Sequence, residues 1–275
     1  MNPRKPQLGR PAALLTGLLV ALVISACAQS PTGRNQLVLQ SDAALAAEGK
    51  RQFEMIRERM PLVQDRATID YIACVSNAIV DQLEGEDAEM YWELAVIDQP
   101  DINAFVLPGG KISVFSGILQ VAENQHQLAT VIGHEVAHVT ANHANERASR
   151  SMVAGVGIDI AAILLGGGYA NQTRAAQQTL QTGAVLGILN PFSRKQESEA
   201  DVIGLKYMAM AGFDPRESVK LWTNMQARNE SQIPEFMSTH PSGETRIESL
   251  VQQLPAALAL YNEAKAQGKE PNCQL

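Results

Sequence analysis

The sequence lacks the motifs that mark several common enzyme classes. It contains no Gly-x-Ser-x-Gly stretch, so the serine nucleophile of that class is not predicted. It has only three cysteines, and Cys74 has no obvious histidine partner that would make it a nucleophile. No glycine-rich loop of the phosphate-binding kind and no internal repeat is present. Nucleophilic hydrolases and phosphate-binding enzymes are therefore disfavoured.

Positive charge is also scarce. The chain has 22 Lys and Arg residues against 29 Asp and Glu residues, and three of the basic residues lie within positions 1–26. Without that segment, nineteen basic residues face twenty-nine acidic ones, which argues against nucleic acid as a partner. About 250 residues then remain, enough to bury one sizeable core, so we expect a single domain over residues 41–275.

The N-terminus has the pattern of a targeting segment. A basic start is followed by a short apolar run at residues 12–24 and by small residues before Cys27. We predict that residues 1–26 are a lipoprotein signal peptide and that Cys27 carries the lipid. Residues 27–40 would be a polar tether, and the absence of Asp directly after Cys27 favours the outer membrane, facing the periplasm. An uncleaved N-terminal anchor is the alternative; both interpretations place the body outside the cytoplasm.

Residues 134–138 read His-Glu-Val-Ala-His. On a helix, His134 and His138 project from one face, so two ring nitrogens can bind one zinc ion. Glu135 would lie beside the metal as the base for a water molecule. The alternative is a chance match on an ordinary amphipathic helix.

A second acidic motif strengthens the zinc interpretation. Glu197 and Asp201 are four residues apart, one helical turn, and catalytic zinc typically takes three protein ligands. We predict Glu197 as the third ligand and Asp201 as the acceptor of the remaining ring N–H of a zinc-binding histidine. Glu199 would point away from this face as a solvated charge. Taken alone, the segment would be read as a charged helix surface.

These motifs resemble those of a known group. The stretches at 133–139, 197–201 and 103–110 are similar to the HtpX-like and prenyl-protease-like gluzincin peptidases, and most similar to their small lipoprotein (LoiP-like) members. The resemblance covers roughly residues 35–250. It implies a zinc endopeptidase with one Zn²⁺ per chain, the ligands and base named above, and polypeptide substrates. The long apolar helices of the membrane-embedded relatives are missing after the leader.

The expected fold is α+β: a mostly helical zincin with a small β-sheet beside the zinc helix. We predict helices at 41–60, 67–83 and 124–149, and strands at 92–97, 103–106 and 112–115. In the resembled family an exposed sheet edge binds a peptide as an added strand. We place that edge at Asn103, Ala104 and Phe105; the alternative is that these residues are only sheet core.

The remaining three histidines differ in how well their positions fit a role at the metal site. His143 lies nine residues after His134, about half a turn round on a helix, so we predict that it faces away from the metal; His126 is predicted to be a surface or helix-start residue. His240 lies in a loop before a proline, where it could bind developing negative charge or fill the fourth zinc position and block the water. Arg246 and Tyr207 are further candidates for stabilising an oxyanion.

Two segments remain. Cys74 and Cys273 are predicted to form a disulfide, with two unpaired thiols as the alternative.

Residues 152–190 are rich in glycine and aliphatic side chains, and we expect an apolar helical hairpin. This hairpin would act as a lid or as a contact with a membrane or a partner; the alternative is that it packs as plain core.

From the resemblance and the predicted location, we expect an envelope endopeptidase that cleaves unfolded or misassembled proteins. The alternatives are an envelope assembly factor or chaperone that holds zinc and rarely cuts, and a processing peptidase with one dedicated substrate.

Overall fold

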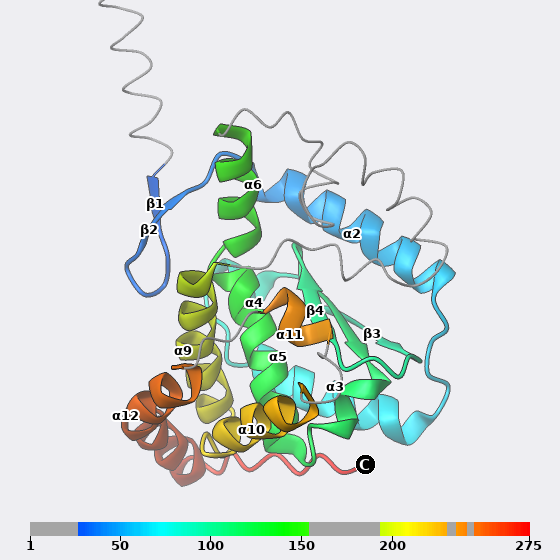
Figure 1. Cartoon of the computed structure of the whole chain (residues 1–275), viewed down its shortest axis with the longest axis vertical. Coiled ribbons are helices and arrows are strands. Elements are labelled where there is room, and N and C mark those ends of the chain that lie inside the picture. The colour runs from blue at the N-terminus through cyan, green and yellow to red at the C-terminus, as the bar shows by residue number, and fades with distance from the viewer. Residues whose placement is uncertain (1–26, 154–192, 230–234, 241–244) are drawn as a thin grey trace, which may run out of the picture.

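The computed structural model describes residues 27–153, 193–229, 235–240 and 245–275 (Figure 1). The predicted signal peptide at 1–26 and the predicted apolar hairpin at 152–190, apart from its first two residues, lie outside this part. The elements are β1 (Cys27–Gln29), β2 (Asn35–Leu37), α2 (Asp42–Arg59), α3 (Arg66–Val80), α4 (Glu86–Glu89), β3 (Glu93–Ile97), β4 (Ala104–Leu107), β5 (Lys111–Phe115), the 3-10 helix η1 (Ser116–Gln120), α5 (Gln125–Thr140), α6 (His143–Val153), α9 (Arg194–Met210), α10 (Glu217–Asn229), α11 (Glu235–Thr239) and α12 (Arg246–Ala266). The structure confirms the predicted α+β class.

The three predicted strands form one sheet in the order β3-β5-β4. Strand β3 runs parallel to β5, and β4 runs antiparallel to β5. Because β5 is the central strand, β4 lies at an edge of the sheet. Gly109 and Gly110 adopt positive φ angles of 82° and 73° in the turn that joins β4 to β5. This backbone conformation is accessible to glycine at little steric cost, which explains the Gly-Gly pair.

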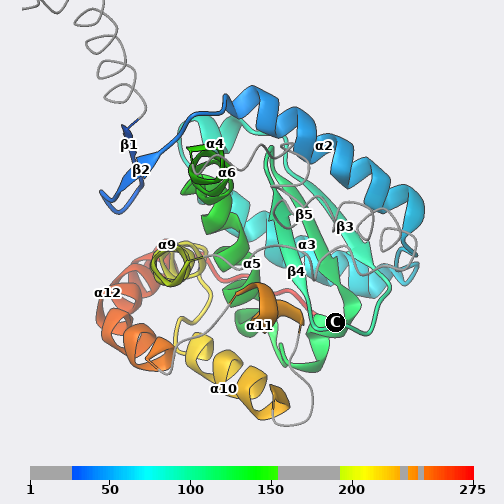
Figure 2. The ribbon, with the colours of Figure 1, turned by 45° about the horizontal axis from the view of Figure 1, so that its top comes forward.

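Both faces of the sheet are covered by helices. Side chains alternate between the two faces along each strand, so each strand contributes apolar side chains to both sides. Phe105 and Leu107 of β4 pack with Phe53 and Ile56 of α2 on one face. The other face belongs to the larger core, which contains residues of α3 and α5 (Figure 2). The sheet is thus held rigidly beside α5, the helix that carries the zinc motif.

Helices α5 and α9 approach each other closely at two glycines. A Cβ added to Gly204 would lie 2.7 Å from the backbone carbon of Gly133 and 2.7 Å from the backbone nitrogen of His134. Glycine at this crossing therefore lets the two backbones touch. Glu197 lies two helical turns before Gly204, on the same side of α9, so this contact brings Glu197 to the zinc motif.

The predicted single helix at 124–149 is wrong. Helix α5 ends at Thr140, Asn142 adopts a φ of 53°, and α6 begins at His143. Asparagine tolerates this left-handed conformation better than most residues, so it can end one helix and start the next. The break changes the direction of the chain, and hence the direction of His143.

The polar segment predicted as a tether contains the antiparallel hairpin of β1 and β2. Its side chains Ser30 and Gln36 are buried, and Gln36 donates to the Ala141 carbonyl oxygen at 2.6 Å. The hairpin therefore packs on the body of the protein. Among the described residues, no helix is both long and apolar enough to cross a membrane.

Cys74 of α3 and Cys273 form the predicted disulfide, across a sequence separation of 199 residues. In the chain-entropy model, closing so long a loop stabilises the fold by about 4 kcal/mol or more. We therefore expect replacement of both cysteines by alanine to lower the free energy of unfolding by about 4 kcal/mol. Urea unfolding of the double variant and the wild type measures this difference, and equal midpoints and slopes would contradict it.

Candidate metal centre

Helix α5 presents the zinc motif from inside the protein. Its N-terminus is capped by Asn124, whose side chain accepts from the backbone N–H groups of His126 and Gln127. The side chains of His134, Glu135 and His138 are all buried, with exposed fractions of 2–3%. Buried polar groups need partners, so the contacts of these three residues define the chemistry of the site.

Four donor atoms from three segments converge here: nitrogens of His134, His138 and His240 and a carboxylate oxygen of Glu197. Five of the distances between these groups lie between 3.1 and 3.4 Å. Donors bound tetrahedrally at about 2.0–2.1 Å from Zn²⁺ would lie about 3.3–3.4 Å apart. The cluster therefore has the dimensions of a zinc site, and it confirms the predicted ligands His134, His138 and Glu197.

The hydrogen bond behind His134 sets which of its ring nitrogens faces the cluster. Its Nδ1 donates to Asp201 Oδ1 at 2.9 Å, because a carboxylate can only accept. Its Nε2 then presents a lone pair to the other donors. The structure thus places Asp201 where it orients a zinc-binding histidine.

Glu135 is buried beside the four donors. Burial raises its pKa to about 7, against the opposing effects of His240 and of the Val106 backbone N–H, which donates to the carboxylate. Its Oε1 atom has no hydrogen-bond partner among the described residues. A buried carboxylate oxygen that accepts no hydrogen bond, next to a zinc site, is suited to accept a proton from a water molecule.

His240 reaches the cluster from the end of α11. Its Nδ1 lies 3.1 Å from Glu197 Oε1 and 3.2 Å from His134 Nε2, while its Nε2 lies 3.3 Å from Glu135 Oε1. The ring also stacks on Phe236, with centroids 4.5 Å apart. His240 therefore stands in the fourth position of the tetrahedron, between the metal ligands and Glu135.

Arg246 lies behind the ligands. Its Nη2 donates to Asp201 at 2.6 Å, its Nη1 donates to Glu197 at 3.3 Å, and its guanidinium stacks 3.4 Å over the ring of Trp222. These contacts support a role in holding the two carboxylates. Contact with an oxyanion remains a prediction.

Two sequence-based assignments near the metal are wrong. Glu199, predicted to be solvated, is buried and accepts hydrogen bonds from Ser30, Thr32, Arg34 and His143. These bonds outweigh burial and lower its pKa to about 2. His143, predicted to face away from the metal, is indeed not among the four donors, but it is fully buried with its Nδ1 2.8 Å from His138 Nδ1. The break at Asn142 accounts for this, because the angular argument assumed a continuous helix. Burial lowers the pKa of His143 to about 4.

The other candidates lie around the centre. The Tyr207 hydroxyl donates to Thr140 Oγ1 at 3.1 Å, outside the four-donor cluster. His126 lies in the first turn of α5, where its Nδ1 accepts from the Asp214 backbone N–H. At the start of β4, the side chains of Ala104 and Phe105 are buried, as is that of Asn103 just before the strand.

The backbone of β4 nevertheless has a free edge, with which none of the described strands pairs. Phe115 N donates to Asn103 O, and in an antiparallel pair such bonds alternate along the strand. The backbone groups of Ala104 and Val106 therefore point away from β5. The N–H of Val106 meets Glu135, so this edge faces the zinc helix.

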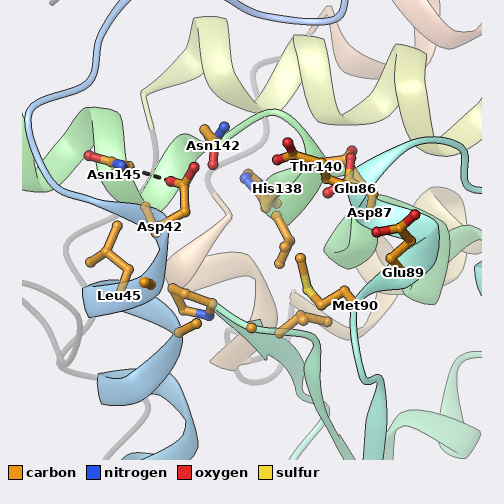
Figure 3. Close-up of a pocket in the computed structure, with 17 residues that line it drawn as sticks. Asp42, Leu45, Glu86, Asp87, Glu89, Met90, His138, Thr140, Asn142 and Asn145 are labelled. Atoms are coloured by element: carbon orange, nitrogen blue, oxygen red, sulfur yellow. Dashed lines mark hydrogen bonds between the residues drawn. The ribbon is translucent and has the colours of Figure 1, made fainter.

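A cavity of about 390 Å³ adjoins the metal centre (Figure 3). It is lined by His138 and Thr140 at the end of α5, by Val106 of β4, and by Leu45 and Met90. Asp42, Glu86, Asp87 and Glu89 stand on its walls. The cavity thus connects the free edge of β4 with a zinc ligand.

Sequence reasoning missed Gly204, Arg34, and the roles of His143 and Glu199. Gly204 carries a signal: it lies seven residues after Glu197, so a small residue falls on the same helix face as a ligand. Arg34 carries no such signal, because its partners Glu146 and Glu199 are more than a hundred residues away.

Comparisons with known proteins agree with this geometry. The sequence profile described as peptidase family M48 matches residues 67–254. The mitochondrial metalloendopeptidase OMA1 of Schizosaccharomyces pombe is 40% identical over 173 residues, which are 62% of this chain and 49% of that protein. Human OMA1 is 31% identical over 258 residues, which are 83% of this chain and 46% of that protein. The beta-barrel assembly-enhancing protease of Escherichia coli is 28% identical over 247 residues, 86% of this chain and 50% of that protein.

The chain spans about half the length of each of these relatives. The family profile nevertheless covers more than half of this chain, including all four donors of the metal centre. The chain belongs to peptidase family M48.

Proposed function

We propose that this protein is a zinc-dependent endopeptidase of the bacterial cell envelope that hydrolyses unfolded or misassembled envelope proteins. One observation carries the proposal: Oε1 of Glu135 is buried, accepts no hydrogen bond from the described residues, and lies 3.3 Å from His240 Nε2, next to a donor set with the dimensions of a tetrahedral zinc site. Metal ligands and a base combined in one buried site are what peptide hydrolysis needs.

The reaction divides between the metal and the side chains. Bound zinc supplies a Lewis acid that lowers the pKa of a water molecule and polarises the scissile carbonyl. Glu135 accepts the proton of the attacking water and passes it to the leaving amine. Asp201 holds the His134 ring in the required tautomer through the 2.9 Å hydrogen bond.

Substrate binding fits the free edge of β4. An extended peptide would add as a strand along Ala104 and Val106, held by main-chain hydrogen bonds to the Ala104 N–H and C=O and to the Val106 C=O, because the Val106 N–H donates to Glu135. One of its side chains would enter the neighbouring cavity, whose lining includes both Val106 and His138. Such binding recognises the backbone of an extended segment, so it selects unfolded segments over folded ones.

The place and partners of the protein belong to the same proposal. A lipid on Cys27 would hold the chain to a membrane, most simply the periplasmic face of the outer membrane, as in the small lipoprotein members of the group. The E. coli relative is named for beta-barrel assembly, which favours contact with envelope assembly machinery. Membrane fractionation of the wild type and Cys27→Ser tests the anchor, and an unchanged distribution would contradict it.

The substrate class is tested by offering one envelope protein in two states. We expect the purified protein to cleave the unfolded form and to spare the folded form, with cleavage abolished by a chelator and restored by Zn²⁺. Equal cleavage of both forms would contradict selection for unfolded chains. Cleavage of a single member of a diverse peptide library would instead identify a dedicated processing peptidase.

A second candidate function is an envelope assembly factor whose zinc site rarely cuts. It is favoured by His240, whose Nδ1 stands in the fourth position of the tetrahedron, where a catalytic zinc site keeps a place for water. A site closed in this way would hold zinc without cleaving.

His240→Ala separates the two functions. If His240 closes an otherwise competent site, we expect the variant to cleave unfolded substrate about tenfold or more faster than the wild type, because the water gains its position. Cleavage rate per bound zinc is the measurement, with His126→Ala as the control histidine outside the cluster. No cleavage by either protein under any condition would favour the assembly role.

A further inference from the structure

A continuous line of side chains runs from the zinc ligand His138 to the N-terminal hairpin. His138 Nδ1 lies 2.8 Å from His143 Nδ1, and His143 Nε2 lies 3.1 Å from Glu199 Oε2. Arg34 Nε then donates to Glu199 Oε2 at 2.6 Å. His138, His143 and Glu199 are at most 5% exposed, so water does not compete for these bonds.

The proton positions along this line follow from its carboxylate end. Glu199 can only accept, so His143 Nε2 carries a proton and donates it. In neutral His143 the Nδ1 atom then accepts, and its donor is the Nδ1–H of His138. This leaves the lone pair of His138 on Nε2, the atom 3.1 Å from His134 Nε2 in the metal cluster. The line therefore selects the tautomer of His138 that binds a cation.

The hairpin holds the far end of this line. The hydroxyl groups of Ser30 and Thr32 donate to Glu199 Oε1. Arg34 also makes a two-pronged ion pair with Glu146 of α6, with both distances 2.7 Å. One guanidinium thus joins α6 to α9 and compensates two buried carboxylates, a geometry that arginine suits and lysine does not.

We propose that the β1–β2 hairpin is a working part of the metal centre: through Arg34 and Glu199 it fixes His143, and His143 positions the ligand His138. In this assignment His143, Glu199 and Arg34 are positioning residues, because none of them is among the four converging donors. The inference depends on the zinc site alone and not on which proteins are cut. It also means that the residues directly after Cys27 contribute to metal affinity.

Zinc affinity of the full mature chain, measured by competition with a chelating dye, tests the proposal. In His143→Leu an apolar side chain fills the space of the ring but cannot accept a hydrogen bond from His138. We expect this variant to bind zinc about 10- to 100-fold more weakly. His143→Asn can accept through its Oδ1, and we expect it to recover affinity to within about threefold of the wild type. The visible spectrum of the Co²⁺-substituted protein should change in the Leu variant and return in the Asn variant.

Arg34→Gln tests the hairpin separately and covers the case in which a His143 variant fails to fold. We expect roughly tenfold weaker zinc binding, against no change for Arg66→Gln, whose side chain is 83% exposed and pairs with Asp70. Circular dichroism of each metal-free variant checks that the fold is retained. Wild-type affinity in His143→Leu, or equal losses in the Leu and Asn variants, overturns the role of His143. Equal affinities of the two arginine variants overturn the role of the hairpin.

Discussion

Glu135→Gln is expected to lower the rate of peptide cleavage by about a hundred- to ten-thousandfold while zinc stays bound, because general-base catalysis typically contributes that much. Glutamine is close to glutamate in shape, and it cannot take a proton from the attacking water. The carboxylate of Glu135 is not among the four converging donors, so the metal keeps its ligands. The expected result is thus loss of rate without loss of metal.

The measurement is initial cleavage rate of an unfolded substrate, with zinc content determined on the same sample. Glu54→Gln on α2, with a side chain 57% exposed, is the matched control and should behave as the wild type. Retention of rate in Glu135→Gln would mean that another group acts as the base. Loss of zinc together with rate would mean that Glu135 supports the ligands instead.

Gly204→Ala is expected to weaken zinc binding although it removes no polar atom. The added Cβ would lie 2.7 Å from the backbone of Gly133 and His134, so α9 must move away from α5. Such overpacking costs about 1–3 kcal/mol. If that strain falls on the zinc-bound state, in which Glu197 on α9 must meet the histidines of α5, affinity falls roughly ten- to a hundredfold.

The direction of this effect is informative, because alanine favours a helix over glycine by about 1 kcal/mol. Propensity alone would make the variant more stable. Zinc competition and thermal unfolding should both show a loss, whereas Ser198→Ala, at an exposed position of the same helix, should show none. An unchanged zinc affinity in Gly204→Ala would contradict the view that backbone contact of the two helices sets the ligand geometry.

Much of the metal centre could be predicted because its information is local. His134 and His138 are one turn apart, so their joint direction follows from helix geometry without knowledge of the rest of the fold. The same holds for Glu197 and Asp201. The alternating and apolar strands around the Gly109-Gly110 turn were equally readable, and the structure has all three.

The predictions for His143 and Glu199 failed because each used a rule for one helix alone and ignored the rest of the fold. The angular argument for His143 was sound for a continuous helix, and Asn142 ended that helix. The solvated interpretation of Glu199 followed the usual behaviour of acidic side chains, and it was wrong because four donors satisfy this carboxylate inside the protein. Three of those donors come from the segment that composition marked only as polar.

By itself, the sequence determined the zinc ligands His134, His138 and Glu197, the candidate base and the three strands of the central sheet, because periodicity and spacing along one element carry that information. Only the tertiary structure decided that His240 takes the fourth position, that His143 supports His138, and that the N-terminal hairpin reaches the metal centre. The physical reason is that buried polar groups must find partners wherever the fold brings them, and no spacing along the chain records which distant residue will be the partner.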